Sequence, residues 1–447
     1  MKHLVDRRTF VRQAATAGAG LFVAAQFGSL ARAAKLPSAN SRLRIAVAGT
    51  NSRGLAHVQL FAGLPNVEIA YICDVDDRAI AKGLDAAAKV QAAVPRGVRD
   101  FRRALDDKQV DAIAIATPDH WHAPMAILAL AAGKHVFVEK PCSHNPGEGE
   151  LLIMAAKKSG LHVQMGNQRR SFAAMQEAVA QIRSGAIGRA YAARGWYVNT
   201  RASIGRGKPQ PVPVWLDYEL WQGPAPRRPF VDNLVHYNWH WHWHWGTGEA
   251  LNNGTHEIDV ARWALGVDHP SRVVSSGGRY HFDDDWETPD TQTIGWEFPD
   301  GKTMSWEGRS CNGFPVEGRA RGTIVYGTEG SALLDAESYV FYDEKNKVVK
   351  EVAPSRQVDA TNTLSSTGLE AEREHFKNFV DAIREDVALT APVADANASV
   401  TLLHLGNIAQ RVGRALQCDP ATGRIQGDAE AMTLWGREYE PGWEPKV

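Results

Sequence analysis

The sequence predicts an α/β protein with an N-terminal parallel-sheet domain and a C-terminal α/β domain whose open sheet is largely antiparallel. Three observations predict it. A strand-length apolar run, Arg44–Ala48, ends in the glycine-rich turn Gly49–Gly54. From Leu43 to about Gly166, strand-like and helix-like patterns alternate, as in parallel sheets with right-handed crossovers. Beyond Gly166, alternating apolar runs separated by turns replace them, which indicates antiparallel pairing.

The first 33 residues are expected to lie outside the fold. Paired arginines, Arg7 and Arg8, precede an Ala/Gly-rich apolar segment, and Ala31-Arg32-Ala33 fits a small-x-small cleavage pattern. This resembles a twin-arginine export signal, with Asp6 where Ser or Thr is commoner. A membrane anchor is the alternative, which the short, glycine-broken run disfavours. We therefore expect a signal at 1–33, a nucleotide-binding domain at 34–166, a substrate-binding and oligomerisation domain at 167–447, and a periplasmic or otherwise exported protein.

Composition narrows the function classes. The expected signal carries five basic residues and one acidic residue, which leaves 45 basic against 50 acidic in the remaining chain. No basic tract indicates nucleic acid or an anionic membrane as a partner. The four cysteines lie far apart, in no metal-binding spacing, and are expected to be mostly free and buried. A small-molecule enzyme or binding protein fits this balance.

The glycine-rich turn indicates a nucleotide site. Its spacing is Gly-x-Asn-x-x-Gly, one substitution from the dinucleotide fingerprint. Gly49 allows a tight turn, Gly54 allows close helix–strand packing, and the N–H groups at the helix start point toward a pyrophosphate. Asn51 tolerates positive φ, but its side chain crowds the phosphate approach. An ordinary strand-turn-helix connection is the alternative.

Asp74 strengthens the nucleotide interpretation. A second strand-like run, Val67–Cys73, ends at Asp74, near the offset of ~20 residues expected for the acid that binds the adenosine ribose. The alternative is a turn residue before the helix that begins near Asp77. An acid at this position favours NAD over NADP.

The remaining elements follow in order. In the first domain we expect strands at Ala112–Ala116, His135–Val138 and His162–Met165, and helices at Ala79–Val90, Pro124–Ala132 and Gly147–Lys158, giving about six strands in a Rossmann-like domain. After a helix at Phe172–Ser184, strands are expected at 190–198, 272–277, 291–298, 303–308, 322–326 and 331–334. Residues 199–236 form a long surface excursion, and helices at Glu370–Arg384 and Ala396–Leu416 close the chain.

Glu139-Lys140-Pro141 follows an inner strand of the first domain. A lysine there projects into the crevice, where partial desolvation makes it a proton donor or a stabiliser of a developing alkoxide. The alternative is an exposed ion pair between Lys140 and Glu139.

The second stretch with candidate catalytic residues is a helix that follows a glycine-rich segment. It carries Asn252, His256 and Asp259. Spacing i, i+4 puts Asn252 and His256 on one face, with Asp259 one turn beyond. Histidine is the natural acceptor for an alcohol proton near neutral pH. A capped or surface histidine is the alternative.

Trp239 to Trp245 alternate tryptophan and histidine. A strand would put His240, His242 and His244 on one face, so a zinc site must be weighed. No third-ligand pattern lies nearby, and aromatic rings stacked on sugar faces fit better. We expect no metal here.

These features together with Ala116-Thr117-Pro118-Asp119-His120-Trp121-His122 resemble the Gfo/Idh/MocA oxidoreductase family from about Arg42 to the C-terminus. The resemblance implies NAD, with NADP as the alternative, and a homodimer or homotetramer built on the open sheet. Because an exported protein has no known free nicotinamide pool to exchange with, we expect the cofactor to be tightly bound. It places the catalytic lysine at Lys140 and the catalytic histidine at His256. The implied cofactor-binding set is Gly49, Asn51, Ser52, Arg53, Gly54, Asp74, Thr117, Pro118, His122, Glu139, Lys140 and Asn167.

One position departs from the family pattern. The family's active-site Asp, four residues before the histidine, is Asn252 here, and an amide cannot stabilise an imidazolium as a carboxylate does. Asp259 or Glu249 are the candidate substitutes. The expected catalytic set is Lys140, His256 and Asn252, and the expected substrate-binding set is Tyr237, His240, Trp243, Asn252 and His256.

Three functions are compatible with these residues. The leading one is an exported sugar or polyol oxidoreductase that keeps its cofactor through export and has it reoxidised in place by a second substrate. The second is a glycosidase that oxidises C3 transiently, eliminates across C2 with help from His256 or Tyr237, and then re-reduces the sugar. The third is a noncatalytic sugar-binding protein, for which Asn252 is the best argument.

Overall fold

The computed structural model describes residues 42–354 and 366–447. The expected export signal at 1–33 lies outside these residues and stays a prediction. In the described ranges, no helix combines the length and apolar character needed to cross a bilayer. All four cysteines are described, and each is free.

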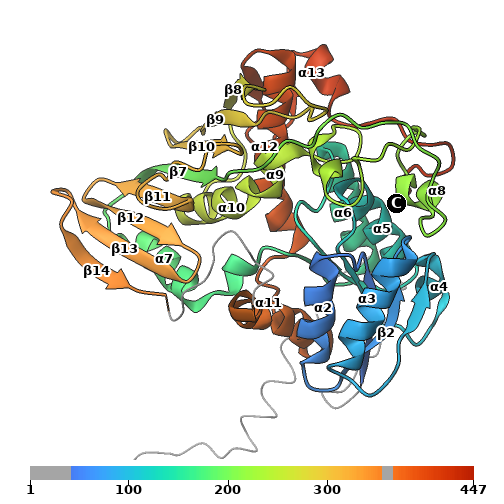
Figure 1. The fold of residues 1–447 in the computed structure, drawn as a ribbon. Coiled ribbons are helices and arrows are strands. Elements are labelled where there is room, and N and C mark those ends of the chain that lie inside the picture. Colours follow the sequence, from blue (N-terminus) through green and yellow to red (C-terminus); the bar gives the residue numbers. More distant parts are fainter. Residues whose placement is uncertain (1–41, 355–365) are drawn as a thin grey trace, which may run out of the picture. The chain divides into compact units, whose positions relative to one another are not determined.

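The N-terminal sheet is parallel throughout, as the alternating pattern predicted (Figure 1). Its six strands lie in the order β3-β2-β1-β4-β5-β6, with the doubly wound arrangement that places ligands at the carboxyl ends of the strands. The strands are β1 (Leu43–Ala48), β2 (Val67–Cys73), β3 (Arg96–Val98), β4 (Ala112–Ile115), β5 (His135–Val138) and β6 (Val163–Met165).

Helices cover both faces of this sheet. They are α2 (Arg53–Ala62), α3 (Asp77–Ala88), α4 (Arg102–Asp106), α5 (Asp119–Ala131) and α6 (Pro146–Ser159). One face packs into a core that includes Phe61 of α2 and Phe376 of α11 (Ser366–Glu385), whose ring lies 4.6 Å from that of Phe137. A late segment of the chain, α11, thus returns to the first sheet.

The second sheet has ten strands and is mostly antiparallel, which confirms the fold class (Figure 1). Only β10 and β7 pair in parallel among its described strands. Their order is β14-β13-β12-β11-β7-β10-β9-β8-β15-β16. The bounds are β7 (Ala190–Val198), β8 (Arg272–Gly278), β9 (Thr291–Glu297), β10 (Thr303–Arg309), β11 (Arg321–Gly327), β12 (Gly330–Asp335), β13 (Ser338–Asp343), β14 (Val348–Val352), β15 (Leu416–Cys418) and β16 (Ile425–Gln426).

Three helices pack on one side of the second sheet: α7 (Ala173–Arg183), α10 (Gly254–Leu265) and α12 (Val393–Val412). The sequence patterns predicted neither β13 to β16 nor the short β3 of the first sheet. Short elements complete the chain, namely η1 (Gln168–Ser171), α8 (Tyr218–Gln222), η2 (Asn238–Trp241), α9 (Gly248–Asn252) and α13 (Ala429–Thr433).

The Trp/His run is not a strand, so the shared histidine face that a strand would give does not form. Residues 238–241 form the 3-10 helix η2, and the Gly246 N–H donates back to His242 O at 2.8 Å. Gly246 packs so closely that a Cβ would lie 2.5 Å from the carbonyl oxygens of Trp239 and His240. The chain folds back on itself here to bury its indoles, which is why the histidines do not share a face.

The helix expected to carry both Asn252 and His256 is also interrupted. It divides into α9 and α10 at Asn253, and the His256 N–H bonds to Asn253 O at 3.1 Å. Asn252 therefore ends one helix, while His256 lies in the first turn of the next.

Candidate active site

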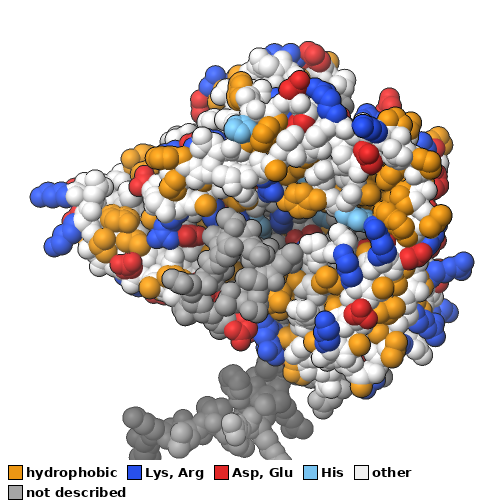
Figure 2. Space-filling view, viewed as in Figure 1, with side chains coloured by type: hydrophobic (Ala, Val, Ile, Leu, Met, Phe, Trp, Pro, Cys, Tyr) orange, Lys and Arg blue, Asp and Glu red, His pale blue; other side chains and the backbone are white. Residues whose placement is uncertain are grey.

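A cavity of about 350 Å³ opens at the carboxyl ends of the first sheet. Its walls come from both sheet domains and from the segment between β7 and α9 (Gly248–Asn252). Figure 2 shows basic, acidic and histidine side chains gathered in a hollow of the visible face. Most of the predicted site residues line this cavity: Gly49, Asn51, Ser52, Arg53, Asp74, Thr117, Pro118, His122, Glu139, Lys140, Tyr237, His240, Asn252 and His256.

The glycine turn has the backbone geometry that its sequence indicated. Gly49 follows β1 with φ +86°, and a Cβ there would lie 2.5 Å from Ala116 O. A Cβ on Gly54 would lie 2.0 Å from Gly49 O, so this glycine permits the close approach of α2 to the turn. Asn51 Oδ1 accepts a hydrogen bond from Lys82 Nζ at 2.9 Å.

Asp74 ties the end of β2 to this turn. Its carboxylate accepts the Thr50 N–H at 2.6 Å and the Asp76 N–H at 3.1 Å. Burial raises the pKa of Asp74 above its ordinary value, although these two backbone donors oppose the shift. The acid sits at the cavity wall, where a ribose-binding carboxylate is expected.

The residues at this end of the cavity fit a dinucleotide. Ser52 precedes α2 and makes no side-chain capping hydrogen bond, so the helix start presents uncapped N–H groups to the cavity. The buried Thr117 Oγ1 has no hydrogen-bond partner among the described residues and belongs to a side chain that lines the same cavity. Both features match a phosphate and a hydroxyl-bearing ribose.

Glu139 does not pair with the Lys140 ammonium, so the alternative of an exposed ion pair is wrong. Its carboxylate accepts hydrogen bonds from Arg53 Nε at 2.7 Å and His57 Nε2 at 3.0 Å. Arg53 Nη2 also donates to Glu372 of α11 at 2.6 Å. Burial would raise the pKa of Glu139, but Arg53 and His57 outweigh it and hold the pKa well below its ordinary value.

Lys140 is directed into the site. Its Nζ donates to Asn252 O at 2.6 Å and to Asn252 Oδ1 at 3.2 Å. Burial lowers the pKa of Lys140, and the carboxylates of Glu139 and Asp119 offset this only in part. The ammonium can therefore release a proton more readily than an exposed lysine.

His122 joins the two strand ends beside Lys140. One ring nitrogen lies 2.8 Å from Thr117 O, after β4, and the other lies 2.6 Å from Pro141 O, after β5. It holds the cavity wall between Thr117 and Lys140.

His256 lines the same cavity as Lys140, so the two residues that the family resemblance implied as catalytic lie at one site. Burial lowers the pKa of His256 well below its ordinary value, and Arg321 and Lys140 lower it further. The imidazole is therefore neutral at neutral pH and a weaker base than an exposed histidine.

Of the two candidate substitutes for the missing aspartate, the structure favours Glu249. Asp259 instead pairs with Arg170 at 2.7 and 2.8 Å and accepts from Ser399. Glu249 Oε1 accepts from Asn252 Nδ2 at 3.3 Å. Asp259 is occupied elsewhere because Arg170 and Ser399 converge on it.

Three predicted site residues do not line the cavity. The Arg411 guanidinium carbon lies over the Trp243 ring, 5.1 Å from the ring centroid. The fold of the Trp/His run turns Trp243 away from the cavity. Asn167 is buried after β6, and its side-chain atoms have no partner among the described residues. Gly54 packs closely against the Gly49 carbonyl of the turn and does not line the cavity. In contrast, Tyr237 and His240 do line the cavity, where His240 stacks on Trp239 at 3.6 Å.

The sequence analysis missed Arg201, Arg321 and Trp121, which also line the cavity. Arg201 lies in the excursion interpreted as surface, and Arg321 starts β11 and donates to Glu257 at 2.9 Å. Trp121 was quoted within the Thr-Pro segment but given no role. No local periodicity identifies an arginine whose partner lies 48 or 64 positions away.

Within residues 42–354 and 366–447, no group of three His, Cys, Asp or Glu side chains is placed to hold a metal ion. His242 lies 3.4 Å from Glu287, and His244 Nε2 lies 2.7 Å from Pro226 O.

Comparisons with known proteins match this arrangement. A Gfo/Idh/MocA model described as an oxidoreductase family with an NAD-binding Rossmann fold matches residues 43–167. A second, described as the C-terminal α/β domain of the oxidoreductase family, matches residues 195–314. The two matches together cover more than half of the chain.

Similar curated proteins match in part. A glycosyl hydrolase family 109 protein of Saccharopolyspora erythraea is 35% identical over 179 residues, which is 36% of this chain and 39% of that protein. An α-N-acetylgalactosaminidase of Tannerella forsythia is 32% identical over 35% of this chain and 37% of its own length. The chain thus spans less than two-fifths of the length of the curated relatives it matches.

A levoglucosan dehydrogenase solved with NADH and levoglucosan is a structural neighbour. It has a TM-score of 0.64 at 20% identity and covers 84% of this chain and 99% of its own. At that identity the likeness shows the shared fold.

Proposed function

Because the chain belongs to the Gfo/Idh/MocA family of NAD-binding oxidoreductases, we propose that it is an NAD(P)-dependent enzyme acting on a sugar or polyol. The observation that carries the proposal is one cavity lined by the nucleotide turn, the Lys140 ammonium and the His256 imidazole. An amine and an imidazole beside a nucleotide site suit hydride transfer that interconverts an alcohol and a carbonyl.

Each residue has a defined task in this reaction. The neutral His256 ring accepts the proton of the substrate hydroxyl, and Lys140 Nζ donates a hydrogen bond to the same oxygen as its charge develops. Bound nicotinamide supplies the hydride acceptor or donor. Tyr237 and the stacked Trp239–His240 pair supply ring faces and polar edges suited to a carbohydrate.

Export with a retained cofactor is part of the proposal. Its support is the paired Arg7-Arg8 pattern, because twin-arginine export moves folded proteins with cofactors aboard. Asp74 supports NAD rather than NADP as the cofactor, and the open second sheet supports a homodimer or homotetramer.

Mass spectrometry of the nucleotide that co-purifies with the protein tests this function. We expect NAD, and we expect its nicotinamide absorbance to change when a sugar is added to the protein alone. Protein that arrives without nucleotide and does not bind added NAD would contradict the proposal.

A glycosidase working through transient C3 oxidation is the second candidate, and the names of the partial relatives favour it. Tyr237, whose hydroxyl accepts Arg201 Nη1 at 2.9 Å, would then assist proton removal from C2. Nitrophenyl glycosides, including the N-acetyl-α-galactosaminide, discriminate the two without an added electron acceptor. Nitrophenol release favours the glycosidase, whereas its absence with sugar-dependent cofactor reduction favours the dehydrogenase.

A further inference from the structure

The orientation of the Asn252 amide is fixed from both sides. Its Oδ1 accepts from Lys140 Nζ at 3.2 Å, and its Nδ2 donates to Glu249 Oε1 at 3.3 Å. A reversed amide would place an NH₂ group against an ammonium and an oxygen against a carboxylate, so both contacts would become repulsive. Glu249 therefore determines which atom Asn252 presents to Lys140.

The surroundings of the Glu249 carboxylate hold it in its ionised form. It is 3% exposed and accepts hydrogen bonds from Arg201 Nε at 2.6 Å, Asn253 Nδ2 at 2.5 Å and Ser310 Oγ at 3.2 Å, besides that from Asn252. Burial would raise the pKa of Glu249, but Arg201 outweighs it and holds the pKa below its ordinary value. A buried carboxylate with this many donors is charged and immobile.

Arg201 is itself fixed by a column of aromatic rings outside the cavity. Its guanidinium lies 4.9 Å from the Trp241 ring, which stacks on Trp286 at 3.9 Å with an interplanar angle of 13°. The Arg279 guanidinium lies 5.0 Å from the far ring, that of Trp286. Two cations thus bracket two stacked indoles, an arrangement that cation–π attraction stabilises.

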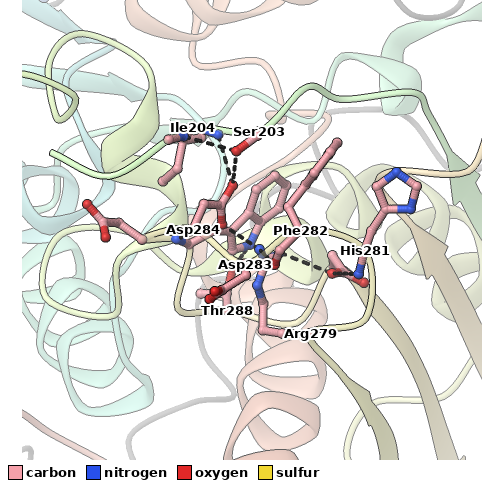
Figure 3. Close-up of polar contacts among 12 residues, drawn as sticks. Ser203, Ile204, Arg279, His281, Phe282, Asp283, Asp284 and Thr288 are labelled. Atoms are coloured by element: carbon pink, nitrogen blue, oxygen red, sulfur yellow. Dashed lines mark hydrogen bonds and ion pairs between the residues drawn. The ribbon is translucent and has the colours of Figure 1, made fainter.

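The far end of the column is anchored to the chain segment that carries Arg201. Figure 3 shows Asp284 between Arg279 on one side and Ser203 and Ile204 on the other. Asp284 accepts from Arg279 Nη2 at 2.6 Å, Ser203 Oγ at 2.7 Å and the Ile204 N–H at 3.0 Å. The loop between β8 and β9 therefore fixes the segment just after Arg201.

We propose that Glu249 is a positioning residue that, through the Asn252 amide, sets the Lys140 ammonium for its hydrogen bond to the substrate oxygen. The proposal rests on the function proposed above. The site carboxylate of this chain thus lies at position 249, three residues before Asn252. It acts on the Lys140 ammonium through the neutral amide of Asn252. Arg201 and the Trp241–Trp286 column hold that carboxylate in place.

Moving the charge tests the relay. Glu249→Gln removes the anion at nearly constant shape, and we expect kcat to fall about 10- to 100-fold, as for a barrier raised by about 1.4–2.8 kcal/mol, with KM changed less than kcat. The double variant Glu249→Gln with Asn252→Asp restores an anion directly beside Lys140. We expect it to recover most of the lost kcat.

Two controls separate this role from a structural one. Glu307→Gln changes a carboxylate of β10 that is ion-paired with Arg194 of β7 and with Arg309, and we expect wild-type kcat. Unfolding temperature and bound nucleotide are measured for every variant, and both should match the wild type in the double variant.

The outcomes are distinct. If Glu249→Gln keeps wild-type kcat, or if the double variant stays as slow as the single one although it is folded and loaded, the relay is overturned. The second result would make Glu249 only a counterion of Arg201. If the wild-type protein itself turns over no sugar, the proposed function fails, independently of these variants.

Discussion

The Asp74 carboxylate accepts the Thr50 backbone N–H at 2.6 Å, which joins the end of β2 to the glycine turn after β1. This one contact holds together the two sequence features that predicted a nucleotide site. The same carboxylate is thus both a structural acceptor and the expected ribose contact.

Replacing Asp74 with alanine should release NAD. The change removes a charge-assisted acceptor, and hydrogen bonds to charged groups contribute about 1.5–3 kcal/mol each, so affinity should fall at least tenfold. Calorimetric titration with NAD and NADP measures it, and the loss should be greater for NAD. Asp85→Ala, at an exposed position of α3, is the control. An equal loss of NAD affinity in that variant would refute the role assigned to Asp74.

Gly49→Ala should unfold the nucleotide site, whereas Gly160→Ala should not. Both glycines have positive φ, +86° and +66°, so both substitutions carry a left-handed penalty of about 1–2 kcal/mol. A Cβ at Gly49 would also lie 2.5 Å from Ala116 O, whereas no atom of the described residues lies within 4 Å of one at Gly160. Nucleotide content and unfolding temperature measure the difference, and equal losses would contradict it.

Lys140→Ala and His256→Ala should each lower kcat by about 10²- to 10⁴-fold, the usual contribution of an acid–base group. Fold and bound nucleotide should persist, and His281→Ala on the surface should have no effect. Because the pKa of His256 lies well below 6.5, the rate should hold as the pH falls through 6.5. Retained kcat in both site variants would contradict the roles assigned to Lys140 and His256.

Buried histidines should make the fold acid-sensitive. Burial lowers the pKa to about 4 in His135 and His375 and to about 3 in His404. Below pH 6.5 the unfolded chain binds these protons and the folded protein does not, so the free energy of unfolding should fall between pH 6.5 and about 4.

Each such histidine contributes a slope of up to about 1.4 kcal/mol per pH unit in that window. Denaturant unfolding at several pH values measures it, and His404→Gln should reduce the slope by about one proton. A slope unchanged by that substitution would argue against the prediction.

The C-terminal tail should help to retain the nucleotide. Trp443 meets the face of Trp121 edge-on at 5.2 Å, and Trp121 lines the cavity. Trp443→Ala removes one of the ring contacts of Trp121, so NAD should dissociate faster, while Trp443→Phe should preserve the contact. The amount of cofactor lost on gel filtration measures this dissociation. Equal retention in both variants would count against this role.

The sequence by itself determined the nucleotide half of this protein. Gly49, Asp74, Thr117 and Lys140 each follow a β-strand, and parallel strands bring their carboxyl ends to one edge. Local periodicity is enough to place them, because the alternation of strands and helices admits few topologies.

Tertiary structure alone decided the other wall of the cavity. The fold of Trp239–Trp245, the break between Asn252 and His256, and the path from Arg201 through Glu249 all depend on long-range packing. Arg201 bonds to a carboxylate 48 residues away, and the Trp241 ring stacks on Trp286. Such pairs leave no periodic trace, because the partners meet only after irregular segments have folded against the completed sheets.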